Sequence, residues 1–269
     1  MRVGFVGDIV GKPGREMLRE HLSRLKERYE IDIVIANGEN ASHGFGLSVK
    51  NCNEILSYGV DFITGGNHIW DKKDIIPMLD TLPVVRPLNY PEGAPGVGVR
   101  MAKVKDESLA IVNLMGHFTM PFVDNVFIKA KEVVKDLKDN GVDSIFIDFH
   151  AEATSEKRAL FLLLKGEVSA ICGTHTHIGT DDMVIEEGTF FVSDVGLSGC
   201  RDGVIGMDEK APLKRFLTGL PASFDIPKKC KKILQMAIFD IKESKTKEAF
   251  KIKLYDDRDE VSLIEAFKE

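Results

Sequence analysis

The first 180 residues of the chain alternate short apolar runs with amphipathic segments, and this alternation constrains the fold more than any other feature of the sequence. The continuous apolar runs predict strands, at residues 2–7, 31–36, 61–64, 144–149 and 169–172. The spacing of apolar residues between these runs predicts helices, at residues 12–29, 48–59, 74–79, 128–139 and 155–165. Strands that alternate with helices are typical of a mostly parallel sheet covered by helices.

The pattern changes in the middle and in the last third of the chain. Residues 96–104 and 108–115 flank a short polar turn, which predicts an antiparallel hairpin. Further strand-like runs occur later in the chain, at residues 183–186, 189–193, 233–241 and 249–255. We expect these later strands to form a second, more antiparallel sheet that packs against the first.

Length and composition favour one α/β domain over residues 1–269. A hydrophobic content of 43% is enough for one sizeable core, and no segment rich in Pro, Gly and Ser marks a linker. The formal net charge of −6 argues against a partner that is a long nucleic acid held on a basic face. A small anionic substrate held by metal ions remains compatible with this charge.

The same survey bears on the location of the protein. No apolar run approaches the ~18 residues that span a bilayer, and no secretory signal follows Met1, so we expect no membrane partner. None of the four cysteines forms a C-x-x-C pair, and we expect reduced thiols in a cytoplasmic protein. The oligomeric state stays open, with a homo-oligomer among the alternatives.

Polar residues recur directly after the apolar runs. These residues are Asp8, Glu39, Asn40, Asn67, His68, His150, and the pair His175 and His177 within Gly-Thr-His-Thr-His. Ligands of open α/β sheets bind outside the carboxyl ends of the strands. We therefore expect these side chains to meet at one edge of the sheet.

Each of these residues alone has an ordinary structural explanation. Asp8 could be a cap or turn former, and Asn40 and Asn67 could tolerate left-handed backbone in glycine-rich turns. A lone histidine at a strand end is more often hydrogen-bonded structure than a ligand. Independent structural roles, however, give no reason for so many nitrogen and oxygen groups to share one edge. Imidazole and carboxylate groups without cysteine suit Fe, Mn or Zn.

The number of candidates predicts two ions rather than one. Seven residues suffice for two ions if one carboxylate bridges them: Asp8, Glu39, Asn40, Asn67, His150, His175 and His177. Two ions about 3.5–4 Å apart can clamp the attacking and leaving oxygens of a phosphoryl displacement. His68, beside Asn67, could then protonate a leaving alkoxide. His43 and His117 lie in loops near the expected site and could line a substrate pocket.

The order of these motifs resembles the signature of the calcineurin-like metallophosphoesterase superfamily. Asp8, the segment 65–68, His150 and the segment 173–177 carry the resemblance, which spans residues 8 to 177. The chain departs from the signature twice. Val10 stands where the first motif has a histidine, and residues 37–40, Asn-Gly-Glu-Asn, replace its usual Gly-Asp. These departures, and the opening Gly-Asp-Ile-Val-Gly-Lys-Pro-Gly, resemble the bacterial YmdB-type branch of 2′,3′-cyclic nucleotide phosphodiesterases.

The resemblance implies a fold and an activity. The implied fold is the metallophosphoesterase αββα sandwich, in which helices flank two packed, mixed β-sheets. The implied activity is hydrolysis of small phosphodiesters, such as 2′,3′-cyclic nucleotides, by a hydroxide that bridges two metal ions. Iron is the ion most expected, then manganese, with zinc the least expected.

The resemblance also implies a role for each site residue. Asp8, Asn40 and His177 would surround the first ion, with Glu39 as the bridge to the second. Asn67, His150 and His175 would complete the second ion, and His68 would be the proton donor. Because Val10 replaces the usual histidine, Asn40 is the nearest substitute ligand at the first ion.

Two other functions remain open at this stage. One is a phosphomonoesterase or nucleotidase that uses the same dinuclear centre. The other is a regulatory protein that responds to a nucleotide or an RNA and turns over slowly. A nucleotide-binding P-loop is not expected, because the sequence contains no G-x-x-x-x-G-K-[ST] motif.

Overall fold

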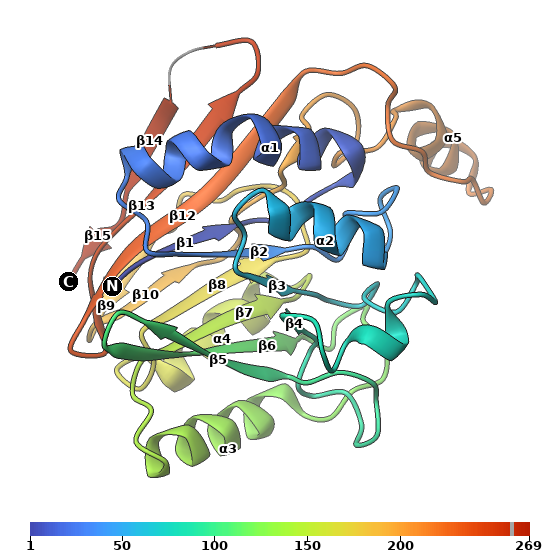
Figure 1. The fold of residues 1–269 in the computed structure, drawn as a ribbon. Helices are drawn as coiled ribbons and strands as arrows, with labels where there is room; N and C mark the ends of the chain where they lie inside the picture. Colours follow the sequence, from blue (N-terminus) through green and yellow to red (C-terminus); the bar gives the residue numbers. More distant parts are fainter. Residues whose placement is uncertain (259–260) are drawn as a thin grey trace.

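The computed structural model describes residues 1–258 and 261–269 and shows two β-sheets packed face to face, with helices on both outer faces (Figure 1). The helices of the described residues are α1 (Gly11–Arg28), α2 (Val49–Ser57), α3 (Val126–Asp139), α4 (Thr154–Leu164), α5 (Lys210–Thr218) and the short 3-10 helix η1 (Ile76–Met78). Helices α1 and α2 cover the first sheet, and α3 and α4 cover the second. The expected α/β fold with two packed, mixed sheets and flanking helices is therefore confirmed.

The first sheet combines the beginning and the end of the chain. Its order is β14 (Val261–Glu265), β13 (Lys245–Tyr255), β12 (Lys232–Lys242), β1 (Arg2–Val6), β2 (Ile33–Asn37), β3 (Phe62–Thr64) and β4 (Val84–Val85). Strands β1 to β4 are parallel, whereas β12 runs antiparallel to β1. The two-residue strand β11 (Gly199–Cys200) also pairs with β12.

The second sheet contains the middle of the chain. Its order is β15 (Phe267–Lys268), β9 (Val184–Glu186), β10 (Thr189–Val192), β8 (Ala170–Thr174), β7 (Ile145–His150), β6 (Glu107–Met115) and β5 (Val99–Val104). Strands β6, β7, β8 and β10 are parallel, and the expected β5–β6 hairpin is confirmed as antiparallel.

The side chains of successive strand residues fill two different cores. Phe5 of β1 and Phe146 of β7 point between the sheets, where their ring centroids are 4.9 Å apart, and Phe239 of β12 joins them. Val6 faces the core under α1 and α2 instead. Strands buried on both faces read as continuous apolar runs, which is why the parallel strands were visible in the sequence.

The expected division of the strands between the two sheets was wrong. Strands β12 and β13 do not form a separate sheet with β9 and β10, because β12 pairs with β1 along five residues. Strands β9 and β10 extend the sheet of β6, β7 and β8. Contacts between distant segments decide which strands pair, and a local apolar pattern contains no information about those contacts.

Some local signals were right and some elements were missed. Ser48 caps α2, since its side chain accepts a hydrogen bond from the backbone N–H of Asn51. Strands β11, β14, β15 and helix α5 were not expected. Pro13 is the third residue of α1 rather than its first, and still lies in the first turn, where its missing N–H leaves no gap in the helix.

The expectation of four reduced cysteines was wrong for one pair. Cys200 and Cys230 form a disulfide with their Cα atoms 5.7 Å apart, and Cys52 and Cys172 are free and buried. The two cysteines are 30 residues apart, a separation that does not predict a disulfide. They meet only because the chain folds back. In the described part of the chain, no helix combines the length and apolar character of a membrane span. The cytoplasmic location stays a prediction.

Candidate metal centre

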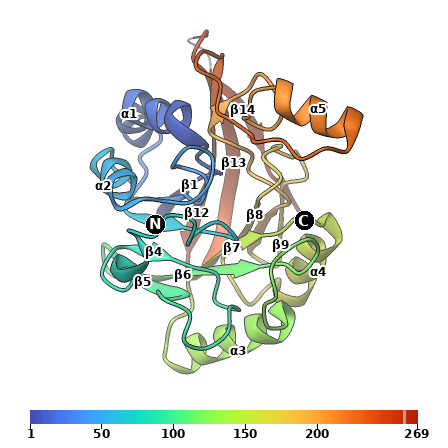
Figure 2. The same ribbon diagram turned by 90° about the vertical axis from the view of Figure 1, so that its right-hand side faces the viewer.

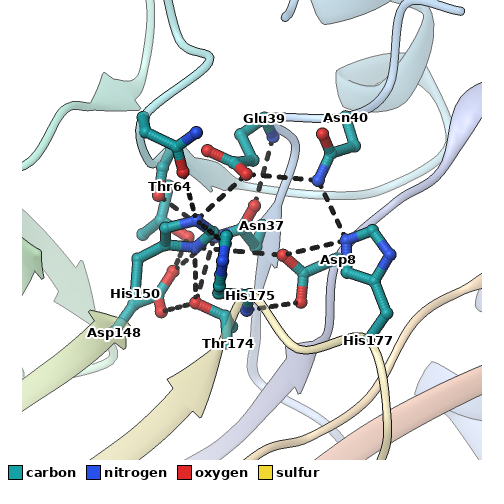
Figure 3. Close-up of polar contacts among 12 residues, drawn as sticks. Asp8, Asn37, Glu39, Asn40, Thr64, Asp148, His150, Thr174, His175 and His177 are labelled. Carbon is teal, nitrogen blue, oxygen red and sulfur yellow. Dashed lines mark hydrogen bonds and ion pairs between the residues drawn. The ribbon is translucent and has the colours of Figure 1, made fainter. Parts of the chain in front are cut away.

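The two sheets bring the seven predicted ligands to one place, six of which are labelled in Figure 3, and Asn67 contacts His150. Asp8 follows β1, Glu39 and Asn40 follow β2, and Asn67 follows β3, all in the first sheet; His150 ends β7, and His175 and His177 follow β8, in the second. The sequence suggested that the five strand ends share the edge of one sheet. That expectation was wrong, because the strands belong to two sheets. They meet because parallel strands of both packed sheets end on the same side of the sandwich. The middle of the cluster is buried, since Asp8 and His150 are 0% exposed and Glu39 is 1% exposed, whereas Asn67 and His175 are half-buried.

One half of the cluster converges on a single ring nitrogen. His150 Nε2 lies 3.0 Å from Glu39 Oε1, 3.1 Å from Asn67 Oδ1 and 3.0 Å from His175 Nδ1. A single N–H can serve only one or two of these three acceptors well, whereas one cation could be held by all of them. The ligand atoms of Glu39, His150 and His175 all lie within 4.8 Å of one another.

The other half surrounds Asp8. Its Oδ1 is buried, has no hydrogen-bond partner among the described residues and lies 3.9 Å from His177 Nε2. Asn40 Nδ2 donates to His177 Nε2 over 3.1 Å and to Glu39 Oε1 over 3.2 Å. Glu39 Oε1 therefore contacts both halves. Asn40 would have to rotate its amide to offer oxygen to a cation.

The three histidines are each oriented by a contact on the outer ring nitrogen. His177 Nδ1 donates to the carbonyl of Ile205 over 2.8 Å, and His175 Nε2 donates to Glu152 over 3.2 Å. His150 Nδ1 donates to Thr174 Oγ1 over 3.0 Å, since that hydroxyl gives its own proton to Asp148. These contacts direct the other nitrogen of each ring into the cluster, as metal-binding histidines require.

The charged groups of the cluster raise the pKa of His150 and lower the pKa of Glu39. Burial opposes the charged form of His150, but the carboxylates of Glu39 and Asp8 outweigh it and raise the pKa of His150 to about 9. Burial likewise opposes the charged form of Glu39, and the charge of His150 lowers the pKa of Glu39 to about 2. Without metal, a proton on His150 thus compensates these carboxylates. Binding of a metal ion would displace that proton.

The residues present therefore fit metal ions. The unpartnered Asp8 oxygen, the three acceptors that share His150 Nε2 and the inward-facing ring nitrogens are lone-pair groups that a cation could use. Gly66 adds a steric observation: a Cβ there would lie 2.1 Å from Glu39 Oε2 and 2.5 Å from His150 Nε2. Only glycine lets the loop after β3 approach the cluster this closely.

A buried network beneath His150 was missed at the sequence level. Asp148, 0% exposed, accepts hydrogen bonds from Thr174 Oγ1 over 2.7 Å, Asn37 Nδ2 over 2.9 Å and Thr64 Oγ1 over 2.5 Å. Burial raises the pKa of Asp148 to about 7. A charged residue that interrupts the apolar run 145–149 was the signal that could have identified it.

We expect Thr174→Val to weaken metal binding about 10–100-fold, the usual effect of losing an outer partner of a histidine ligand. The substitution keeps the shape but removes both the acceptor for His150 Nδ1 and the donor to Asp148. Calorimetric titration of the metal-free protein measures this effect. Thr246→Val is the matched control, because Thr246 is also buried and donates to a backbone carbonyl outside the cluster. Equal losses in both variants would contradict an orienting role for Thr174.

His68 lies beside the cluster rather than within it. Its backbone N–H donates to Glu39 Oε2 over 3.2 Å, while its ring lines the adjoining cavity. Asp71 accepts a hydrogen bond from His68 Nδ1 over 2.8 Å, and the ring packs edge-on against Phe45. Asp71 was not identified from the sequence, although a carboxylate three residues after His68 was a signal for this contact. Nε2 is the remaining ring nitrogen for contact with a ligand.

The cavity at the cluster has a volume of about 350 Å³ and different walls from those expected. Gly44 and Phe45 of the 41–46 loop line it, but His43 is exposed and borders another cavity. His117 of the 116–127 loop bonds to Glu156 and Asp124 instead of lining the cavity. The missing wall comes from residues 204–224, which include the unexpected helix α5. No helix or strand was expected in this segment.

Comparison with known proteins identifies the family of this chain. The family model described as YmdB-like protein matches residues 5–254. The chain is 45% identical to the 2′,3′-cyclic-nucleotide 2′-phosphodiesterase of Bacillus subtilis strain 168, over 94% of this chain and 95% of that protein.

Solved structures show the same fold along the whole chain. A phosphatase from Mycoplasma pneumoniae superposes with a TM-score of 0.89 at 32% identity, covering 99% of this chain and 94% of that one. A Thermus thermophilus protein described as hypothetical superposes with a TM-score of 0.88 at 37% identity, covering 99% and 100%. The chain therefore belongs to the YmdB-like family and is a metallophosphoesterase.

Proposed function

We propose that this chain hydrolyses small phosphodiesters, such as 2′,3′-cyclic nucleotides, at a centre of two transition-metal ions. The observation that carries the proposal is the convergence of seven nitrogen and oxygen groups from five strand ends, with the histidines already oriented inward. The name of the Bacillus subtilis relative supports the diester substrate.

The two halves of the cluster support two ions with a shared carboxylate. Asp8, Asn40 and His177 would hold one ion, and Asn67, His150 and His175 the other. Glu39 is the proposed bridge, because its Oε1 lies 3.0 Å from His150 Nε2 and 3.2 Å from Asn40 Nδ2. Imidazole, amide and carboxylate donors without thiolate suit iron, manganese or zinc. Iron is the proposed ion, with manganese the next candidate.

The chain's own groups would orient the diester and move its protons. When bound, the ions would neutralise the phosphate and lower the pKa of a nucleophilic water. Asp71 holds the His68 ring through Nδ1, which leaves Nε2 at the cavity to protonate the departing oxygen. Asp8, Glu39 and His150 are buried, which strengthens the electrostatic interactions among them.

The proposed enzyme is one domain over residues 1–269. Its first sheet pairs β1 with β12, and β15 joins the second sheet, so neither sheet is complete without the end of the chain. Its proposed partner is a small diester rather than a long nucleic acid, in keeping with the net charge of −6.

We expect the reconstituted protein to hydrolyse 2′,3′-cyclic AMP with Mn²⁺ or Fe²⁺, and to act far more weakly on long duplex DNA. The reason is that two cations and a small cavity suffice for a single diester, whereas a long duplex needs many basic contacts. Chromatographic product analysis at two salt concentrations tests both substrates. Strongly salt-dependent cleavage of long RNA or DNA, without turnover of small diesters, would favour a nuclease instead.

Comparison of bis-p-nitrophenyl phosphate with p-nitrophenyl phosphate separates the diesterase from a phosphomonoesterase on the same centre. The proposal requires the diester to have the higher kcat/KM. A preference for the monoester would replace it with a phosphomonoesterase or nucleotidase activity.

A further inference from the structure

The cavity at the candidate metal centre has two walls of opposite chemistry. One wall carries polar groups of the site, among them Glu39, His68 and His175. The other wall is apolar and is formed by Phe45, Ile205, Met207, Pro212, Phe216 and Phe224. No lysine or arginine lines this cavity within the part of the chain that the structure describes. A ligand that fills it would therefore meet the polar wall with one end and an apolar surface with the other.

The apolar wall is tied directly to the polar one. The carbonyl of Ile205 accepts the Nδ1 proton of His177 over 2.8 Å, so the backbone of the wall contacts a candidate ligand. The ring of Phe45 packs edge-on against His68, with centroids 5.0 Å apart. These two contacts set the distance between the apolar wall and the place where the phosphate would react.

Helix α5 supplies the most exposed aromatic side chain of the wall. Phe216 is 77% exposed although it borders the cavity, and Pro212 lies four residues earlier on the same helix face. Figures 1 and 2 show α5 at the edge of the sandwich, outside the two helix layers. The guanidinium of Arg215 lies over the ring of Phe224, 5.7 Å from its centroid. A flat apolar group in the cavity would remove the Phe216 ring from water.

We propose that Phe45, Phe216 and Phe224 form a subsite for one uncharged aromatic group, a nucleobase, and that this subsite makes the chain select nucleotide diesters over diesters without a base. Aromatic side chains stack on the faces of all nucleobases. Because no basic residue lines the cavity, a second phosphate would meet the apolar wall, so the proposed substrate carries a single diester. The inference rests on the proposed function, since it takes the phosphate to lie at the metal centre.

The test compares 2′,3′-cyclic AMP with ethylene phosphate, which has the same five-membered cyclic diester but no nucleoside. In the metal-loaded full chain, Phe216→Ala should lower the ratio of kcat/KM for the nucleotide to kcat/KM for ethylene phosphate about 5- to 150-fold, the range typical of losing one base-stacking contact. Most of the change should be a higher KM for the nucleotide. Leu217→Ala is the matched control, because Leu217 is the next residue of α5, is 84% exposed and does not line the cavity. Its ratio should stay that of the wild type.

Binding measurements separate failure of the subsite from failure of the proposed function. Calorimetry with adenosine 3′-monophosphate and inorganic phosphate should show weaker nucleotide binding in Phe216→Ala and equal phosphate binding. If the wild type hydrolyses no diester but this difference appears, the proposed function fails and the base subsite stands. An unchanged substrate ratio, or equal nucleotide affinity in the wild type and Phe216→Ala, would overturn the subsite.

Discussion

Glu39→Ala should leave the chain with little bound metal after reconstitution and lower diester turnover by about 10³-fold or more. Glu39 Oε1 contacts both halves of the cluster, so its loss removes a ligand from both proposed ions. Metal ions contribute several kcal/mol to the stabilisation of such transition states, and each ~1.4 kcal/mol corresponds to a factor of ten in rate. Elemental analysis of the reconstituted variant, paired with steady-state kinetics, measures both effects.

Glu156→Ala is the matched control for Glu39→Ala. Glu156 is a largely buried carboxylate that also contacts a histidine, His117, but lies outside the cluster. This variant should keep close to two ions per chain. Full metal content in Glu39→Ala would rule out the bridging role, and loss of one ion alone would assign Glu39 to a single site.

His68→Ala should keep both ions but lose ~10²–10⁴-fold in turnover of a diester with a poor leaving group, the usual contribution of a general acid. The metal content should be preserved because Glu39 is bonded by the backbone N–H of residue 68, which alanine retains. The loss should be smaller for bis-p-nitrophenyl phosphate, since p-nitrophenolate needs little protonation to leave. Kinetics with both substrates, together with metal analysis, test this.

His43→Ala provides the control for His68→Ala, because His43 is an exposed histidine that borders a different cavity. It should behave as the wild type with both substrates. Equal losses with good and poor leaving groups in His68→Ala would show that His68 positions the phosphate instead. A fall in metal content would make it a ligand.

The candidate site could be predicted from the sequence because its signals are local. Each candidate ligand lies at the end of an apolar run or within a few residues of it, so the strand and the polar residue are predicted from neighbouring positions, as at Asp8 after β1. Ser48 at the start of α2 and the β5–β6 hairpin are equally local. Buried parallel strands keep these signals strong, because both of their faces must be apolar.

The groups that support the site could not be predicted in the same way. Asp148 acts through Thr174 and Thr64, which come from different strands and meet only in the folded chain. The apolar wall of the cavity is formed around α5, whose exposed Phe216 resembles an ordinary surface residue in the sequence. The role of such residues depends on which side chains lie beside them in the folded chain.

The sequence by itself determined the alternation of strands and helices, the strand ends that carry the candidate ligands, and the chemistry of those side chains. Tertiary structure alone decided that β12 pairs with β1, that the ligands come from two sheets, and that Cys200 meets Cys230. The physical reason is the range of the interactions. Burial periodicity and capping act over a few residues, whereas strand pairing, the orientation of His150 and His177, and the second wall of the cavity depend on contacts between segments far apart in the chain.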